Sequence, residues 1–91
     1  MSFIIKKQNN NIFNVTVSDN TITQHKVTVS DDVHLDLTNN CVTKESLVEF
    51  SFKFLLAREP NTSIMSSFDV SVISEYFSDY RNEVRRWCNE F

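Results

Sequence analysis

The 91-residue sequence contains no glycine and only one proline. Phosphate-cradling loops, dinucleotide-binding turns and the nucleophile elbow of hydrolases need glycine, because their backbone approaches a ligand closely or adopts a positive φ. The sequence therefore excludes these three kinds of enzyme motif. Turns must instead be built from asparagine and aspartate, which tolerate left-handed backbone geometry. The candidate turns are Asn9-Asn10-Asn11, Asp19-Asn20 and Asn39-Asn40.

Long apolar runs are also missing. The run at residues 3–5 is too short for a signal peptide and is followed by its lysines, and no stretch approaches the roughly 20 apolar residues of a membrane span. The two cysteines, Cys41 and Cys88, are too few for the disulfide framework of a small secreted protein. We therefore expect a single cytoplasmic domain over residues 1–91, with free, buried thiols and no membrane partner.

Charge is spread unevenly over a chain whose formal net charge is -3. Residues 31–80 carry nine acidic and three basic side chains, whereas both ends of the chain are net basic. An acidic middle section repels phosphate, so this distribution argues against a broad polyanion-binding surface.

The strongest helix signal covers residues 44–58, at the centre of the chain. Thr43 can cap its first turn, and Pro60 disfavours helical geometry in the residue before it. Only a narrow strip is polar, where Glu49 and Lys53 have the favourable i,i+4 spacing. The apolar positions are Leu47, Val48, Phe50, Phe52, Phe54, Leu55 and Leu56. So wide an apolar arc must be covered on two or three sides, by the rest of the chain or by a second copy.

The region before this helix alternates like a β-sheet. Residues 3–7 indicate a short strand, and residues 12–18 and 21–29 alternate apolar and polar side chains around a turn. Val27 and Val29 are expected to face the core. His25 shares their parity, which favours a histidine packed at the end of the core face over a functional histidine.

Residues 33–38 fit both a strand and a helix, because Val33, Leu35 and Leu37 alternate while Val33 and Leu37 also lie four residues apart. We predict a short helix, since Asp31 and Asp32 at its start are stabilised by the helix dipole. After Pro60 we expect a polar connector.

The last helical region begins after Asp69, which can cap a helix at Val70. An apolar stripe then recurs at spacings of four and three residues. It consists of Ile73, Phe77, Tyr80, Val84, Trp87 and Phe91. The sequence leaves open whether residues 70–91 form one helix or two, divided at Ser78-Asp79. The predicted fold is α+β: an N-terminal antiparallel β-hairpin or three-stranded meander followed by three to four helices.

No group of side chains has the spacing of a catalytic or metal site. The soft or borderline metal ligands are isolated along the chain, and they are His25, His34, Cys41 and Cys88. Structural zinc sites take their ligands in close pairs, so we predict no metal, no cofactor and no Cys–His nucleophile. A carboxylate cluster at Asp31, Asp32 and Asp36 is explained by a solvated helix start.

Three arginines near the C-terminus, Arg81, Arg85 and Arg86, form a possible contact for a phosphate or an acidic partner. The alternative is an exposed helix face partly neutralised by Glu83 and Glu90.

The pattern Ser-Phe-Lys-Phe-Leu-Leu-Ala-Arg-Glu-Pro at residues 51–60 continues into Ser63-Ile64, Phe68-Asp69, Ser71, Ile73 and Tyr76-Phe77. It resembles the recurring pattern of a family of short uncharacterised prokaryotic proteins, over roughly residues 26–80. The resemblance implies a small cytoplasmic domain. It supplies no functional residues, because that family has no established activity.

Residues 24–58 are also similar in outline to the ribbon-helix-helix regulators of transcription: a strand, a short capped helix and a longer capped helix. In that family two chains pair one strand each into a ribbon that enters the major groove of DNA. By position, Gln24, Lys26 and Thr28 would face the bases, and Thr43 and Lys44 would lie at a phosphate. A hairpin partner for this strand, however, would make the ribbon too wide for the groove.

Three functions remain in order. The first is a non-enzymatic protein-interaction module, homodimeric through the apolar central helix. The alternative is DNA binding of the ribbon-helix-helix type. A small enzyme comes third, and it would need a pocket that holds His25 or His34 beside a carboxylate or thiol.

Overall fold

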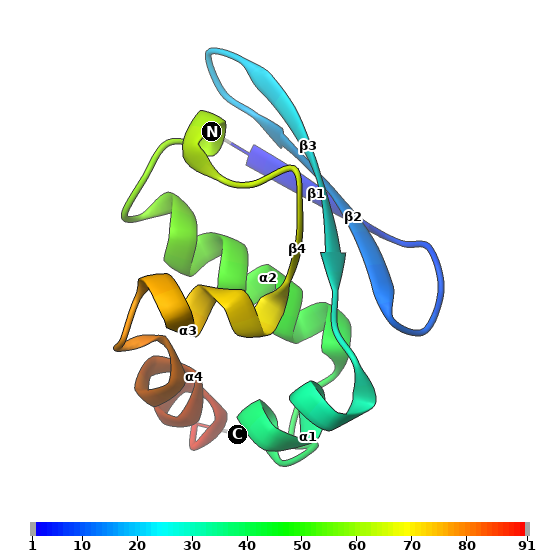
Figure 1. Ribbon diagram of the computed structural model, residues 1–91, viewed down its shortest axis with the longest axis vertical. Coiled ribbons are helices and arrows are strands. Elements are labelled where there is room, and N and C mark those ends of the chain that lie inside the picture. The colour runs from blue at the N-terminus through cyan, green and yellow to red at the C-terminus, as the bar shows by residue number, and fades with distance from the viewer. Residues whose placement is uncertain (1, 91) are drawn as a thin grey trace.

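The computed structural model describes residues 2–90 and has an α+β fold (Figure 1). In chain order its elements are β1 (Ser2–Lys7), β2 (Ile12–Ser18), β3 (Ile22–Thr28), α1 (Asp31–Thr38), α2 (Lys44–Leu56), η1 (Asn61–Ser63), β4 (Ser67–Asp69), η2 (Val70–Val72), α3 (Ile73–Tyr76) and α4 (Tyr80–Cys88). The first three strands form the antiparallel meander, which decides between the two predicted arrangements. The sheet order is β1-β2-β3-β4, and β4 runs parallel to β3.

The sheet is apolar on one face and open on the other. Along β2, the side chains of Phe13, Val15 and Val17 are buried, and the residues between them point to the opposite face. On β3, His25 and Val27 follow the same inward parity, so the prediction of a packed histidine is confirmed. Figure 1 shows the helices on the apolar face.

The short segment before α2 is a helix, as its cap indicated. Ser30 Oγ accepts a hydrogen bond from the Val33 backbone N–H at 3.2 Å. Asn39 and Asn40 end α1 with φ values of 53° and 62°, and no other residue of the 2–90 segment has a positive φ. The prediction of left-handed turns is therefore wrong for residues 9–11 and 19–20. At the first of these turns, the Asn9 side chain accepts from two later backbone N–H groups instead.

The central helix begins where its cap predicted and ends two residues early. Thr43 Oγ1 accepts from the Ser46 N–H at 3.1 Å. At the other end, the N–H groups of Arg58 and Glu59 both donate to Leu55 O at 2.9 Å. This tight turn ends α2 at Leu56, so the predicted end at residue 58 is wrong.

The apolar arc of α2 is covered within the chain on two sides. Toward the sheet, the Phe52 ring lies 6.1 Å from Phe3 and 6.2 Å from Phe68, centroid to centroid. Toward the C-terminal helices, Phe50 stacks on Trp87 at 4.6 Å, and Phe54 meets Tyr80 edge to face at 5.2 Å. The expectation that this helix needs a second copy to cover it is therefore not supported.

The C-terminal region consists of two helices, α3 and α4, and Phe91 of the predicted stripe lies outside the described residues. Asp69 caps the preceding η2 turn through the Ser71 N–H. The Tyr80 hydroxyl reaches Ser51 on α2 at 2.6 Å, and burial raises the pKa of this phenol well above its ordinary value. Within residues 2–90, no helix has the length and apolar character required to cross a membrane.

Candidate interaction surfaces

The outer edge of β1 is open. This strand pairs with β2 on one side, and no described strand pairs with it on the other. The Gln8 N–H donates to Ile12 O, so alternate residues of the antiparallel ladder direct their backbone groups toward β2. By this alternation, the backbone groups of Phe3, Ile5 and Lys7 point outward. The Ile4 side chain, on the open face, is 63 % exposed.

The opposite edge of the sheet is closed by the chain itself. The Lys26 N–H donates to Ser66 O at 2.8 Å, and β4 continues the pairing in parallel. A polar network fastens the segment before β4. Asn61 Nδ2 donates to Thr21 O at 2.8 Å and to Thr23 Oγ1 at 2.9 Å, and His25 Nδ1 lies 2.7 Å from Met65 O. Since a carbonyl oxygen only accepts, Nδ1 carries the proton.

This pairing argues against the ribbon-helix-helix geometry. In that arrangement the strand equivalent to β3 must pair with its copy in a second chain, but β2 and β4 flank it here. The predicted base-reading residues Gln24 and Lys26 are exposed and Thr28 is half-buried, all on the open face of a four-stranded sheet. A sheet of this width exceeds what the major groove admits.

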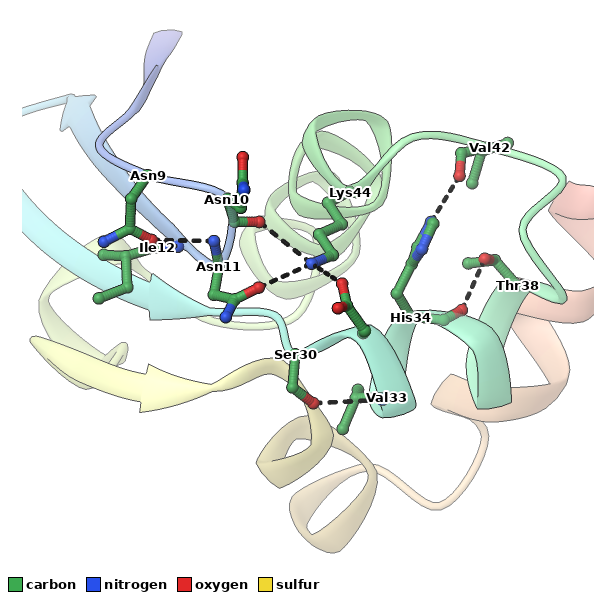
Figure 2. Close-up of polar contacts among 11 residues, drawn as sticks. Asn9, Asn10, Asn11, Ile12, Ser30, Val33, His34, Thr38, Val42 and Lys44 are labelled. Atoms are coloured by element: carbon green, nitrogen blue, oxygen red, sulfur yellow. Dashed lines mark hydrogen bonds and ion pairs between the residues drawn. The ribbon is translucent and has the colours of Figure 1, made fainter.

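The predicted phosphate-binding residues have structural roles. The Thr43 side chain caps α2. Figure 2 shows Lys44 reaching back to the β1–β2 loop, where its Nζ donates to Asn10 O at 3.1 Å and to Asn11 Oδ1 at 2.8 Å. The same ammonium pairs with Asp31 Oδ1 at 2.5 Å, which lowers the pKa of that carboxyl group. Lys44 therefore joins the β1–β2 loop to α1.

The three C-terminal arginines do not form one cationic patch. Arg81 pairs with Asp36 of α1 at 2.7 Å, and Arg86 pairs with Glu83 at 3.1 Å. Arg85 is exposed and lines a hollow between α1 and α4. A common phosphate site of all three is therefore not assembled in this structure.

Both histidines are engaged in hydrogen bonds that position the chain. His25 bonds to Thr23 and to the Met65 carbonyl, and His34 Nε2 lies 2.6 Å from Val42 O (Figure 2). In the part of the chain that the structure describes, no three His, Cys, Asp or Glu side chains group as they would around a metal ion.

An apolar groove that the sequence did not reveal lies between the end of α2, the η1–β4 connection and α3. Its volume is about 400 Å³. Met65 and Tyr76 in its wall are 42 % and 69 % exposed, and Glu59 contributes a carboxylate. The other lining residues are Leu55, Ser63, Ile64, Phe68, Val72, Ile73 and Phe77. The groove is wide enough for a bulky apolar side chain.

No protein-family model, no curated protein and no solved structure matches this chain. The similarity to short prokaryotic proteins stays a prediction. Function is therefore inferred from the geometry of the described residues.

Proposed function

We propose that the protein is a cytoplasmic, non-enzymatic interaction module that forms a homodimer through β1. The open outer edge of that strand carries the proposal. An extended segment can add to such an edge, and the backbone hydrogen bonds then supply affinity while the side chains select the partner. The free thiols of Cys41 and Cys88 agree with a reducing compartment.

A second copy is the occupant that the sequence of β1 favours. Two antiparallel β1 strands related by a two-fold axis can pair with Ile4 opposite Ile4 of the second copy. In this register Phe3 lies opposite Ile5, and Ser2 lies opposite Lys6. Apolar side chains then meet on both faces of the sheet, and the ammonium groups of the two chains lie at opposite ends of the junction.

The neighbouring register with the same facial parity is less favourable. Centring the axis on Ile5 places Ile4 opposite Lys6 and Phe3 opposite Lys7. Each apolar side chain beside the axis then faces a lysine, and cross-strand pairs of matching character are lost. The first register also uses the outward backbone groups of Phe3 and Ile5, which bond to each other across the junction. The dimer therefore has one continuous eight-stranded sheet.

The test is the molar mass in solution as a function of concentration, measured by light scattering after gel filtration. We expect the wild type to be a dimer and Ile4→Lys to be a monomer, because two lysines would face each other at the axis. The matched control is Ile22→Lys on β3. Ile22 is 67 % exposed against 63 % for Ile4, but it lies away from the open edge. Equal behaviour of the two variants, or a wild type that stays monomeric, would overturn the proposal.

Hydrogen exchange sharpens the test to single amides. On raising the concentration, the N–H groups of Phe3 and Ile5 should gain protection, because they form the bonds of the junction. The Ile4 amide already faces β2 and should not change. Protection that appears instead at the groove around Tyr76 would place the interface elsewhere and contradict a dimer through β1.

A further inference from the structure

Two cysteines that are far apart in the sequence come together in the fold. Cys41 lies in the connection between α1 and α2 and is exposed, whereas Cys88 is the last residue of α4 and is buried. The Cys41 thiol lies 4.0 Å from the backbone oxygen of Cys88. Both cysteines line one hollow between α1 and α4. The sequence prediction of two buried, isolated thiols is wrong on both points.

The two thiols also influence each other directly. Burial raises the pKa of Cys88 to about 12, and the neighbouring Cys41 thiol raises it further by hydrogen bonding and charge. Such an effect requires the sulfur atoms to be close. One thiol of the pair therefore meets solvent, and the other lies behind it, which is the arrangement of an attacking and a resolving cysteine.

We propose that Cys41 and Cys88 form a reversible oxidation site that a low-molecular-weight disulfide, such as oxidised glutathione, converts to an intramolecular disulfide. The Cys41 thiolate attacks one sulfur of the small disulfide and releases one equivalent of its thiol. Cys88 then loses its proton and attacks the Cys41 sulfur of the mixed disulfide, which releases the second equivalent. Two protein thiols are oxidised, and the small disulfide is reduced to two thiols.

The bond would fasten the end of the chain. The start of α4 is already held by the Ser51–Tyr80 hydrogen bond and by the Arg81–Asp36 ion pair. A disulfide at Cys88 would hold its last turn as well, and it would close a loop spanning 47 positions of the chain. Cross-linking positions this far apart restricts the unfolded chain strongly, so oxidation should stabilise the fold.

The experiment exposes the reduced full-length protein to oxidised glutathione and follows mass, free thiols and thermal unfolding. The wild type should lose both thiols and two hydrogen atoms in mass, stay the same size, and gain at least roughly 10 °C in Tm. Cys41→Ser should retain the Cys88 thiol and its original Tm. Cys88→Ser should stop at the mixed disulfide on Cys41, which identifies the order of attack.

The Cys41→Ser variant replaces an exposed side chain and should fold normally. A wild type that accumulates the mixed disulfide while Cys88 stays a free thiol would overturn the proposal, as would disulfides formed only between chains. The proposed dimer does not enter the outcome, because an intramolecular disulfide forms equally in Ile4→Lys.

Discussion

At one edge of the sheet, β4 and the segment before it cover β3, whereas at the other edge no described strand pairs with the outer side of β1. The two ends are also fastened differently. His25 and Asn61, both buried and uncharged in these hydrogen bonds, hold the covered edge. Lys44 holds the β1–β2 loop through an ion cluster in which the Asp31 side chain is 90 % exposed. The fold therefore closes one edge with buried groups and leaves the other accessible.

The largest expected effect comes from Phe52→Ala, which loosens both edges at once. Its ring is fully buried and lies against Phe3 on β1, His25 on β3 and Phe68 on β4. Removing it leaves a cavity under the sheet and should lower the free energy of unfolding by about 3–5 kcal/mol. Chemical denaturation measures the loss.

The control for this change is Phe50→Ala, on the opposite side of α2, where the ring is only half-buried against Trp87. It should destabilise less and leave amide protection in β1 and β4 unchanged. Equal losses from the two substitutions would contradict a role for Phe52 in joining the edges.

A change at Asn61 should separate the two edges. Asn61→Ala removes the donor to Thr21 O and Thr23 Oγ1, and it should lower the free energy of unfolding by about 1–2 kcal/mol. Exchange of the Lys26 amide, which bonds to Ser66 O, should accelerate while β1 amides keep their rates. Asn14→Ala, which removes an exposed bond to Gln8, is the matched control and should change stability by less than about 0.5 kcal/mol.

The smallest effect is expected at the ion cluster, where solvent screens the charges. The folded-state pKa of Asp31 is lowered by Lys44, so its contribution is present above the ordinary value of 3.8 and is lost as the pH falls through the lowered value. The Tm advantage of wild type over Asp31→Asn should shrink in that range and also with added salt. An advantage that is constant from pH 6 to pH 2 would contradict the pairing.

Local signals predicted much of the architecture. The alternation in residues 12–18, the caps at Ser30 and Thr43, and the left-handed Asn39-Asn40 pair each act over a few neighbouring residues. Such patterns determine where an element begins, what type it is and which face it buries. The three-stranded meander, the short helix and the packed His25 follow from them.

The missed features depend on long-range pairing. β4 has three residues and no alternating pattern, and its parallel partner lies about forty positions earlier with no turn between them to indicate the pairing. The contact between Cys41 and Cys88 arises only when α4 packs near α1, so spacing could not reveal it. The open β1 edge likewise became visible only when the strand order was known.

The parallel placement of β4 has a consequence for synthesis. The ribosome delivers the meander first, and the three residues that shield β3 leave the exit tunnel only after both α1 and α2 have been made. Until then the nascent sheet has two bare margins, and a half-finished chain is most prone to stick to its neighbours. The pace of translation across residues 29–66 therefore governs how long this vulnerable interval lasts.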